Sequence, residues 1–162
     1  MNHLHYLEHP SPLGQLTLVA SESGVCGIYF HDQRNFKGTL NWQPVQQHAL
    51  LELAAAQLDE YFAGRRKEFA FQLDLQVSGT AFQQQVWQEL LTIPFGKTSS
   101  YGRHAGLIER PRAVRDVGGA IGRNPISIVV PCHRVLGSSG ALTGYDGGLE
   151  RKKYLLELEG VL

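Results

Sequence analysis

Alternation of apolar and polar residues predicts a pair of strands near the start of the chain. Residues 15–19 alternate with a period of two, which is typical of a half-buried strand. The short polar segment Ser21-Glu22-Ser23-Gly24 separates them from the apolar residues 25–30. Strands joined by so short a turn pair with each other, so we predict a β-hairpin here. Residues 69–73 are apolar enough to form a further strand.

Helical spacing of apolar residues predicts one helix in the first half of the chain and more in the second. Pro44 is expected to be the first residue of a helix whose apolar positions continue to Phe62, and Gly64 is expected to end it. Thr80 and Gln83 form a capping box for the next helix. That helix has an apolar stripe formed by Phe82, Val86 and Leu90.

Two short helices follow, and a tight turn joins them. Ser100 is a candidate N-cap for a helix over 101–108, and Arg110-Pro111 can start a second helix that reaches about Ile121. This pairing is typical of a helix-turn-helix. The second helix contains Gly118-Gly119-Ala120, at a cost of about 1 kcal/mol per glycine. We expect such small residues where another backbone comes close, either in a narrow DNA groove or against a strand.

A last helix over 149–159 carries a carboxylate on its apolar face. Glu159 lies on the same side as Leu155 and Leu156, near the end of the helix where the dipole disfavours negative charge. A carboxylate placed there requires a partner. His133 and Arg134 are both candidates.

The strongest chemical signal is a cysteine that directly follows an apolar run. Ile128-Val129-Val130 predicts a buried strand, which Pro131 would end. Cys132 comes next and is followed by His133. A thiol reacts as its thiolate, and a neighbouring basic group promotes that form. The alternative is a buried unreactive cysteine, as we expect for Cys26, which has no such neighbours.

Composition limits the class of protein. The chain has 162 residues, of which 43% are hydrophobic and 19% charged, as in soluble globular proteins. Its two cysteines are too few for a disulfide framework, which favours a reducing compartment. The sequence contains no signal-peptide pattern and no apolar run long enough to span a membrane. We therefore expect a cytoplasmic protein without a membrane partner.

The charge distribution indicates a polyanion partner although the net charge is zero. Residues 1–79 carry five basic and eight acidic residues, a balance of −3. Residues 97–134 carry seven basic and two acidic residues, a balance of +5. A basic block within a neutral chain is typical of a nucleic-acid footprint, although a solvated helix face gives the same pattern. The basic members of the block are Lys97, Arg103, Arg110, Arg112, Arg115, Arg123 and Arg134.

Several motifs together resemble one known family, the O6-alkylguanine-DNA alkyltransferases, also called methylated-DNA–protein-cysteine methyltransferases. The most specific is the pentapeptide Pro131-Cys132-His133-Arg134-Val135. Related alkyltransferase-like proteins carry tryptophan in place of this cysteine, so the resemblance implies the reactive form. The other matching motifs are Tyr61-Phe62-Ala63-Gly64, Gly79-Thr80-x-Phe82-Gln83, Ile93-Pro94-x-Gly96, Ser100-Tyr101-Gly102, Asn124-Pro125 and Gly144-Tyr145-x-Gly147-Gly148.

The resemblance implies a fold and a reaction. The fold is a small α/β, ribonuclease H-like N-terminal domain at 1–76 and a mostly helical C-terminal domain at 77–162 with a helix-turn-helix. The reaction moves an alkyl group, mainly methyl, from O6 of guanine in double-stranded DNA to Cys132, once and irreversibly. O4-methylthymine is a further possible substrate. No cofactor and no metal are implied, and the protein is expected to act as a monomer, with cooperative binding to DNA left open.

The resemblance also implies residue roles. Cys132 accepts the alkyl group, His133 takes the thiol proton with Glu159 orienting it, and Tyr101 donates a proton toward the purine. Arg115 fills the space left by a flipped base, since the target atom is inaccessible within a duplex. The remaining expected site residues are Ser100, Gly118 and Arg123 at the minor groove, and Asn124, Pro131, Val135, Tyr145, Asp146 and Gly147 around the substrate pocket.

Three features depart from the family pattern. Asp116 stands where alanine is usual, Asp146 stands where a small uncharged residue is usual, and the zinc ligands of some eukaryotic members are missing. The main rival function is a sensor that binds alkylated DNA without reacting and recruits other repair proteins. A cysteine hydrolase is a weaker rival, because no oxyanion-hole signature is evident.

Overall fold

The computed structural model describes residues 3–107, 113–137, 140, 142 and 144–162. The chain divides into two compact units, residues 1–77 and 78–162. The first is a four-stranded sheet with one helix, and the second is mostly helical, which agrees with the fold class predicted from the sequence. Among the residues described, no helix has both the length and the apolar character needed to cross a membrane.

The sheet of the first unit has the strand order β3-β2-β1-β4. The predicted hairpin is confirmed: β2 (Leu16–Ala20) and β3 (Val25–Phe30) pair antiparallel. β2 also pairs antiparallel with β1 (His5–His9), a strand that the sequence pattern did not reveal. β4 (Gln43–Pro44) runs parallel to β1. All five residues of β2 are buried instead of every second one, so both faces of this strand are covered, one of them by α1.

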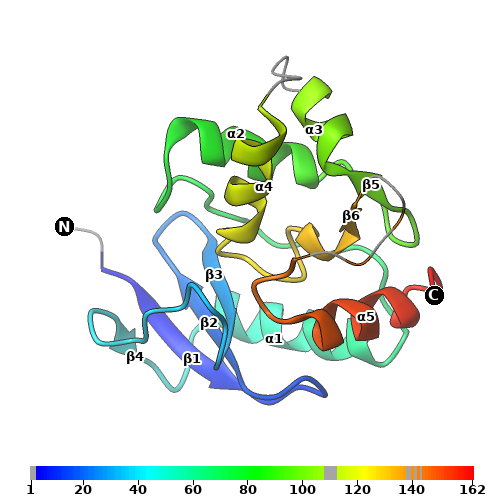
Figure 1. The fold of residues 1–162 in the computed structure, drawn as a ribbon. Coiled ribbons are helices and arrows are strands. Elements are labelled where there is room, and N and C mark those ends of the chain that lie inside the picture. The colour runs from blue at the N-terminus through cyan, green and yellow to red at the C-terminus, as the bar shows by residue number, and fades with distance from the viewer. Residues whose placement is uncertain (1–2, 108–112, 138–139, 141, 143) are drawn as a thin grey trace. The chain divides into compact units, whose positions relative to one another are not determined.

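The single helix of this unit, α1 (Ala49–Phe62), lies along one face of the sheet (Figure 1). The predicted start at Pro44 was wrong, because Pro44 lies in β4 and His48 is the N-cap, accepting a hydrogen bond from the backbone N–H of Leu51. Gly64 follows the C-cap with a φ of 76°, which confirms its predicted role.

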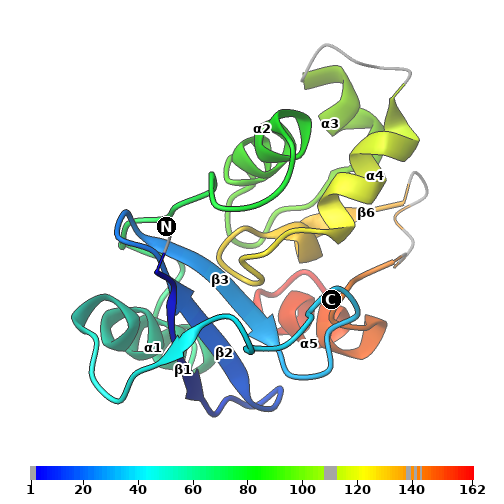
Figure 2. The same cartoon turned by 90° about the vertical axis from the view of Figure 1, so that its left-hand side faces the viewer.

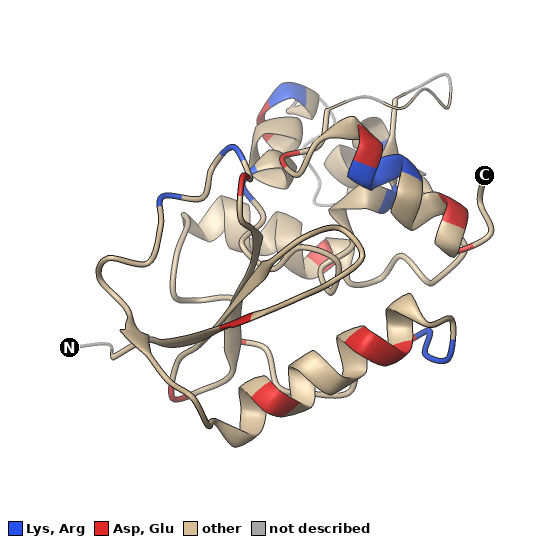
Figure 3. Ribbon diagram, turned by 90° about the horizontal axis from the view of Figure 1, so that it is seen from below, with Lys and Arg blue, Asp and Glu red and all other residues tan. Residues whose placement is uncertain are grey.

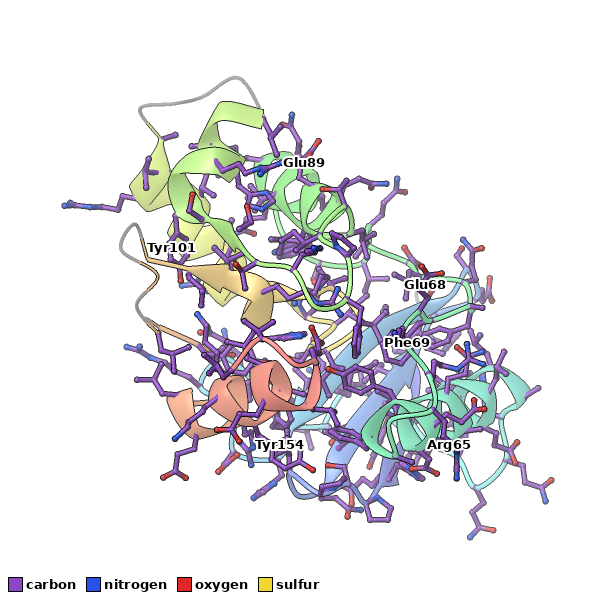
Figure 4. All side chains as sticks on the ribbon, turned by 90° about the vertical axis from the view of Figure 1, so that its right-hand side faces the viewer. Arg65, Glu68, Phe69, Glu89, Tyr101 and Tyr154 are labelled. Atoms are coloured by element: carbon purple, nitrogen blue, oxygen red, sulfur yellow. The ribbon has the colours of Figure 1, made fainter. Side chains whose placement is uncertain are left out.

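Residues 69–73 do not form a strand. Their only bridge among the described residues joins Leu73 to Val25. The segment instead packs through aromatic side chains, and the ring of Phe69 (labelled in Figure 4) lies 5.4 Å from that of Tyr61 on α1. The segment therefore closes the core beside α1 without extending the sheet.

The second unit is built on three helices that pack together (Figure 2). They are α2 (Ala81–Leu90), α3 (Tyr101–Leu107) and α4 (Val114–Gly122). The predicted capping box of Thr80 and Gln83 is confirmed. Between α2 and α4, the indole N–H of Trp87 donates to the carbonyl of Ala120 at 2.7 Å. The predicted restart at Arg110-Pro111 lies outside the described residues.

The segment between α4 and the cysteine is not the strand that its apolar run predicted. Residues 126–130 form consecutive tight turns, with Ile128 in the left-handed region at a φ of 74°, which is strained for a β-branched residue. A short 3-10 turn, η1 (Cys132–Arg134), follows. β6 (Val135–Leu136) then pairs parallel with β5 (Ser99–Ser100), and α5 (Leu149–Leu158) ends the unit.

Candidate active site

Cys132 begins η1 and is held by Asn124, the second residue after α4. The side-chain amide of Asn124 donates to Sγ of Cys132 at 3.2 Å and to the carbonyl of Val130 at 2.8 Å. Its oxygen accepts from the backbone N–H of Ile126 at 3.0 Å. One buried side chain therefore fixes both the turn and the thiol. This explains the failed strand prediction, because Asn124 satisfies backbone groups that a strand would pair with a neighbour.

A buried carboxylate organises the two residues after the cysteine. Oε2 of Glu159 lies 2.7 Å from Nε2 of His133, and Oε1 accepts from Nε of Arg134 at 2.7 Å. Both sequence candidates for the partner of Glu159 therefore contact it. Nδ1 of His133 is buried and makes no hydrogen bond to any described residue. When Nε2 donates to Glu159, Nδ1 is left with a lone pair that can accept a proton.

The side chain of Arg134 is buried, and its hydrogen bonds connect parts of the fold instead of facing solvent. Its side chain is 8% exposed, and its guanidinium also donates to the carbonyl of Ile93 at 2.7 Å. Its inclusion in the basic footprint was therefore wrong, since the sequence cannot distinguish a buried arginine from a surface one. The exposed members of the block within the described residues are Lys97, Arg103, Arg115 and Arg123.

In the protein without substrate, burial favours the uncharged forms of both Cys132 and His133. Burial raises the pKa of the Cys132 thiol to about 11, although the Asn124 hydrogen bond and the positive charge of Lys152 act to lower it. Burial also lowers the pKa of His133 below its usual value, although Glu159 opposes that change. The resting site therefore holds a thiol beside a neutral imidazole, and a thiolate forms only when a proton is transferred.

Lys152 on α5 is a site residue that the sequence reasoning missed. It is fully buried, and its ammonium group donates to the carbonyl of Val135 at 2.6 Å. Burial lowers its pKa to about 8, with the Cys132 charge acting in the opposite direction. The signal was present in the spacing, because Lys152 precedes Leu155 and Leu156 by three and four residues on the buried helix face.

The face of α4 that carries the other candidate residues is open. Arg115 and Arg123 are exposed, and a side chain added at Gly119 would meet nothing within 4 Å. No described part of this chain therefore requires the small residue at Gly119, which argues against packing on a strand. A Cβ at Gly118 would lie 3.7 Å from the ring of Tyr101.

Tyr101 and the pocket loop complete the candidate set. Tyr101 begins α3, and Ser100 caps that helix by accepting from the N–H of Arg103 at 3.2 Å. Pro131, Val135 and Gly147 are buried, whereas Tyr145 and Asp146 are half-buried. The structure thus brings together Asn124, Cys132, His133, Glu159 and Lys152 through hydrogen bonds or charge, whereas Arg115 and Arg123 lie on the exposed face of α4.

Charged residues differ between the two units. α1 contains Glu52, Asp59 and Glu60 and no basic residue (Figure 3). α4 contains Arg115 beside Asp116, with Arg123 following directly. No group of three or more His, Cys, Asp or Glu residues in the described part of the chain could hold a metal ion.

Comparison with known proteins identifies the family. The model of the 6-O-methylguanine DNA methyltransferase DNA-binding domain matches residues 81–161, and that of the ribonuclease-like domain of the same proteins matches residues 4–75. The chain belongs to the 6-O-methylguanine DNA methyltransferase family. The two domain matches fall within the two compact units.

Individual members of this family are similar over nearly the whole chain. A methylated-DNA–protein-cysteine methyltransferase of Mycobacterium leprae is 49% identical, with 96% of this chain and 92% of the relative covered. One from Haemophilus influenzae is 40% identical, with 99% and 89% covered. The crystal structure of Mycobacterium tuberculosis OGT in complex with DNA superposes with a TM-score of 0.86 at 48% identity, covering 96% and 92%. These relatives are methyltransferases, so they support the reactive prediction over the sensor.

Proposed function

We propose that this protein repairs DNA by moving an alkyl group, mainly methyl, from O6 of guanine to Sγ of its own Cys132. The relatives are named for methylated DNA and a protein cysteine, and one of them was crystallised with DNA. Two hydrogen bonds carry the proposal. One joins Asn124 to Sγ of Cys132, and the other joins His133 to Glu159. This arrangement supplies a nucleophile, a base and a residue that orients the base.

The transfer is a single displacement at the alkyl carbon. Sulfur forms a bond to that carbon as the bond from carbon to O6 breaks, and the electron pair remains on the purine. The thiol proton passes to Nδ1 of His133, directly or through one water molecule. The purine takes up a proton with the help of the Tyr101 hydroxyl and leaves as ordinary guanine. The thioether has no return path, so each molecule acts once.

The buried surroundings determine when the thiolate forms. Because burial raises the pKa of Cys132, the free protein holds the thiol in its protonated form. Asn124 and Lys152 both favour the thiolate, and they are in place before the substrate arrives. We infer that the proton leaves as the substrate closes the site, which confines reactivity to the correct target.

DNA binding is assigned to the open face of α4. Arg115 would enter the minor groove and occupy the space of the flipped guanine, while Ser100, Gly118 and Arg123 would lie against the backbone. The small residues of α4 would let the helix approach the groove closely. Pro131, Val135, Tyr145, Asp146 and Gly147 would surround the extruded base. The protein would act as a monomer in the cytoplasm.

Mass spectrometry of the intact protein tests the proposal. After the protein is mixed with excess duplex that contains O6-methylguanine, one methyl group should appear, on the peptide that contains Cys132. The Cys132→Ala variant should take up none, and Cys26→Ala should react as the wild type does. Binding without transfer would favour the sensor. Repeated turnover, or label on Cys26, would contradict the proposed mechanism.

A further inference from the structure

A polar pocket lies in the helical unit, between the loop that follows α2 and the helix α3. Its volume is about 250 Å³. Three apolar residues line it together with six polar ones, which are Thr92, Lys97, Thr98, Ser99, Arg103 and His104. None of these belongs to the candidate active site, so the proposed alkyl transfer gives this pocket no role.

Two polar side chains at this pocket are buried without partners. His104 is 1% exposed, and neither of its ring nitrogens has a hydrogen-bond partner among the residues the structure describes. The hydroxyl oxygen of Ser99, a half-buried residue, is also buried and has no hydrogen-bond partner among the described residues. Buried polar groups in native proteins are almost always hydrogen-bonded, so two of them lining one pocket require an explanation. A bound polar ligand provides one.

The charges around the pocket select the sign of that ligand. Lys97 and Arg103 are both exposed, and neither forms an ion pair with a described residue. Glu89 on α2 (labelled in Figure 4) is the acidic group whose charge acts on His104. Among the described residues, two cations against one carboxylate give the pocket a positive balance, which favours an anion.

We propose that this pocket binds a phosphate group. The hydroxyls of Thr98 and Ser99 and the ring of His104 would donate to its oxygens, and Lys97 and Arg103 would balance its charge. Free phosphate carries up to two negative charges and a backbone phosphodiester carries one, and the oxygens of either group accept several charge-assisted hydrogen bonds, so either can use these donors. The pocket is smaller than those of drug-sized ligands, which are roughly 300–1,000 Å³, so it suits a phosphate group better than a whole nucleotide.

Binding is coupled to a proton on His104. Burial lowers the pKa of this histidine, with Glu89 raising it and Arg103 lowering it further, so the ring is neutral while the pocket is empty. A bound anion stabilises the imidazolium and so raises the pKa of the ring. Binding of a backbone phosphodiester, whose charge does not change in this range, therefore takes up a proton and tightens as the pH falls. Free phosphate becomes less charged over the same range, so its affinity gains less.

Two sources can supply the phosphate, the backbone of a DNA duplex or free phosphate, and one experiment separates them. The ring nitrogens of His104 are followed by NMR in the full-length protein at pH 6.5, without alkylated DNA. Potassium phosphate is titrated against potassium chloride at equal ionic strength, and an undamaged duplex is titrated separately. A saturable shift of His104 with phosphate alone identifies free phosphate. A shift with the duplex at micromolar concentration identifies the DNA backbone only if Lys97→Gln/Arg103→Gln abolishes it, because DNA bound on α4 can also shift His104 through the contact between α3 and α4.

Variants of the exposed pocket residues Lys97 and Arg103 test the proposal without altering the buried His104, whose substitution could impair folding. The double variant Lys97→Gln/Arg103→Gln should weaken the response at least tenfold. The control Arg34→Gln/Lys37→Gln, which removes two exposed charges from the first unit, should leave it unchanged. The proposal is overturned if neither ligand shifts His104 beyond the chloride control, or if the double variant responds like the wild type. None of these outcomes depends on alkyl transfer.

Discussion

Glu159 lies 2.7 Å from Nε2 of His133, with both side chains fully buried. The same carboxylate accepts from the guanidinium of Arg134 through both of its oxygens. We therefore expect two functions for it: fixing the imidazole so that Nδ1 can accept the thiol proton, and neutralising a buried cation. These functions should be lost together when the charge is removed.

Glu159→Gln keeps the shape of the side chain but leaves Arg134 as an uncompensated buried charge. We expect a loss of about 3–5 kcal/mol in the free energy of unfolding, measured with urea. We also expect alkyl transfer to slow by at least about 100-fold at a temperature where the variant is folded, which is the scale of general-base catalysis.

Glu157→Gln on the same helix is the matched control. Glu157 is exposed and lies 3.8 Å from Lys153, so its loss should change stability by less than about 1 kcal/mol. If Glu159→Gln were as mild as this control, the buried carboxylate would have neither of the functions assigned to it.

Lys152→Met should make Cys132 less reactive. The ammonium group lowers the pKa of the thiol, and methionine fills a similar volume without charge. The pH profile for alkylation of Cys132 by iodoacetamide should therefore move to higher pH. Lys153→Met, at an exposed neighbouring position, should leave the profile in place. An unchanged profile in Lys152→Met would mean that Lys152 donates hydrogen bonds to the carbonyls of Val135 and Gly144 but does not affect the reactivity of the thiol.

Local signals were sufficient for much of the fold. The capping box at Thr80 and the left-handed glycine at Gly64 are encoded within a few residues, so the helix ends they mark were predicted correctly. Pro44 was misread because a proline at a helix start and one in a short edge strand look alike in sequence. β4 depends on pairing with β1, which is far away along the chain.

In the candidate site too, local signals were predicted and features that depend on contacts between distant residues were not. Cys132, His133 and Glu159 were found because their chemistry and spacing are visible in the sequence. The turns at residues 126–130 were missed because the side chain of Asn124 holds them, and an apolar run gives no sign of that. Lys152 was missed because charged residues are assigned to the surface unless a buried partner is known.

Cys26→Ala should reduce the loss of stability at alkaline pH. Burial raises the pKa of Cys26 from 9.0 to about 12 in the folded protein. Because the folded state holds this proton more tightly, the contribution is full below pH 9 and is lost as the pH rises toward 12.

The measurement is the free energy of unfolding by urea at pH 8, 9, 10 and 11. The variant should fall less steeply than the wild type above pH 9. Cys132 also lowers the free energy of unfolding between pH 9 and about 11, and Lys152 raises it from about pH 8 to 10.5. Both residues are present in the wild type and in Cys26→Ala, so their effects cancel in the comparison. Equal slopes would mean that Cys26 is not buried as a neutral thiol.

Arg115→Ala should impair the repair of duplex DNA far more than reaction with the free base O6-benzylguanine. Arg115 is exposed on α4 and is not among the partners of Cys132, so the chemical step does not require it. If Arg115 occupies the space of the flipped base as we propose, its loss should cost a few kcal/mol in extrusion. Rates of thioether formation on the two substrates measure this difference, with Arg65→Ala as a control for lost surface charge. Equal losses on both substrates would assign Arg115 to folding or chemistry.

Asp146→Ser should increase both thiol reactivity and duplex affinity. Asp146 is half-buried in the loop before α5, and its negative charge raises the pKa of Cys132. The neutral variant should therefore move the alkylation profile of Cys132 to lower pH. If this loop lies beside the DNA phosphates as we propose, removing the negative charge should also strengthen duplex binding, by about 1 kcal/mol or less because the site is partly solvated.

Salt separates these two effects of Asp146. The gain in duplex affinity should shrink between 20 mM and 150 mM salt, as the Debye length falls to roughly 8 Å. The change in the thiol pKa should remain, since that interaction lies inside the protein. Glu150→Ser changes an exposed residue four positions away. It should alter neither the alkylation profile of Cys132 nor the salt dependence of duplex affinity. If Asp146→Ser instead weakens duplex binding or lowers stability at every salt concentration, the carboxylate holds the loop through a local partner, and repulsion of DNA is not its role.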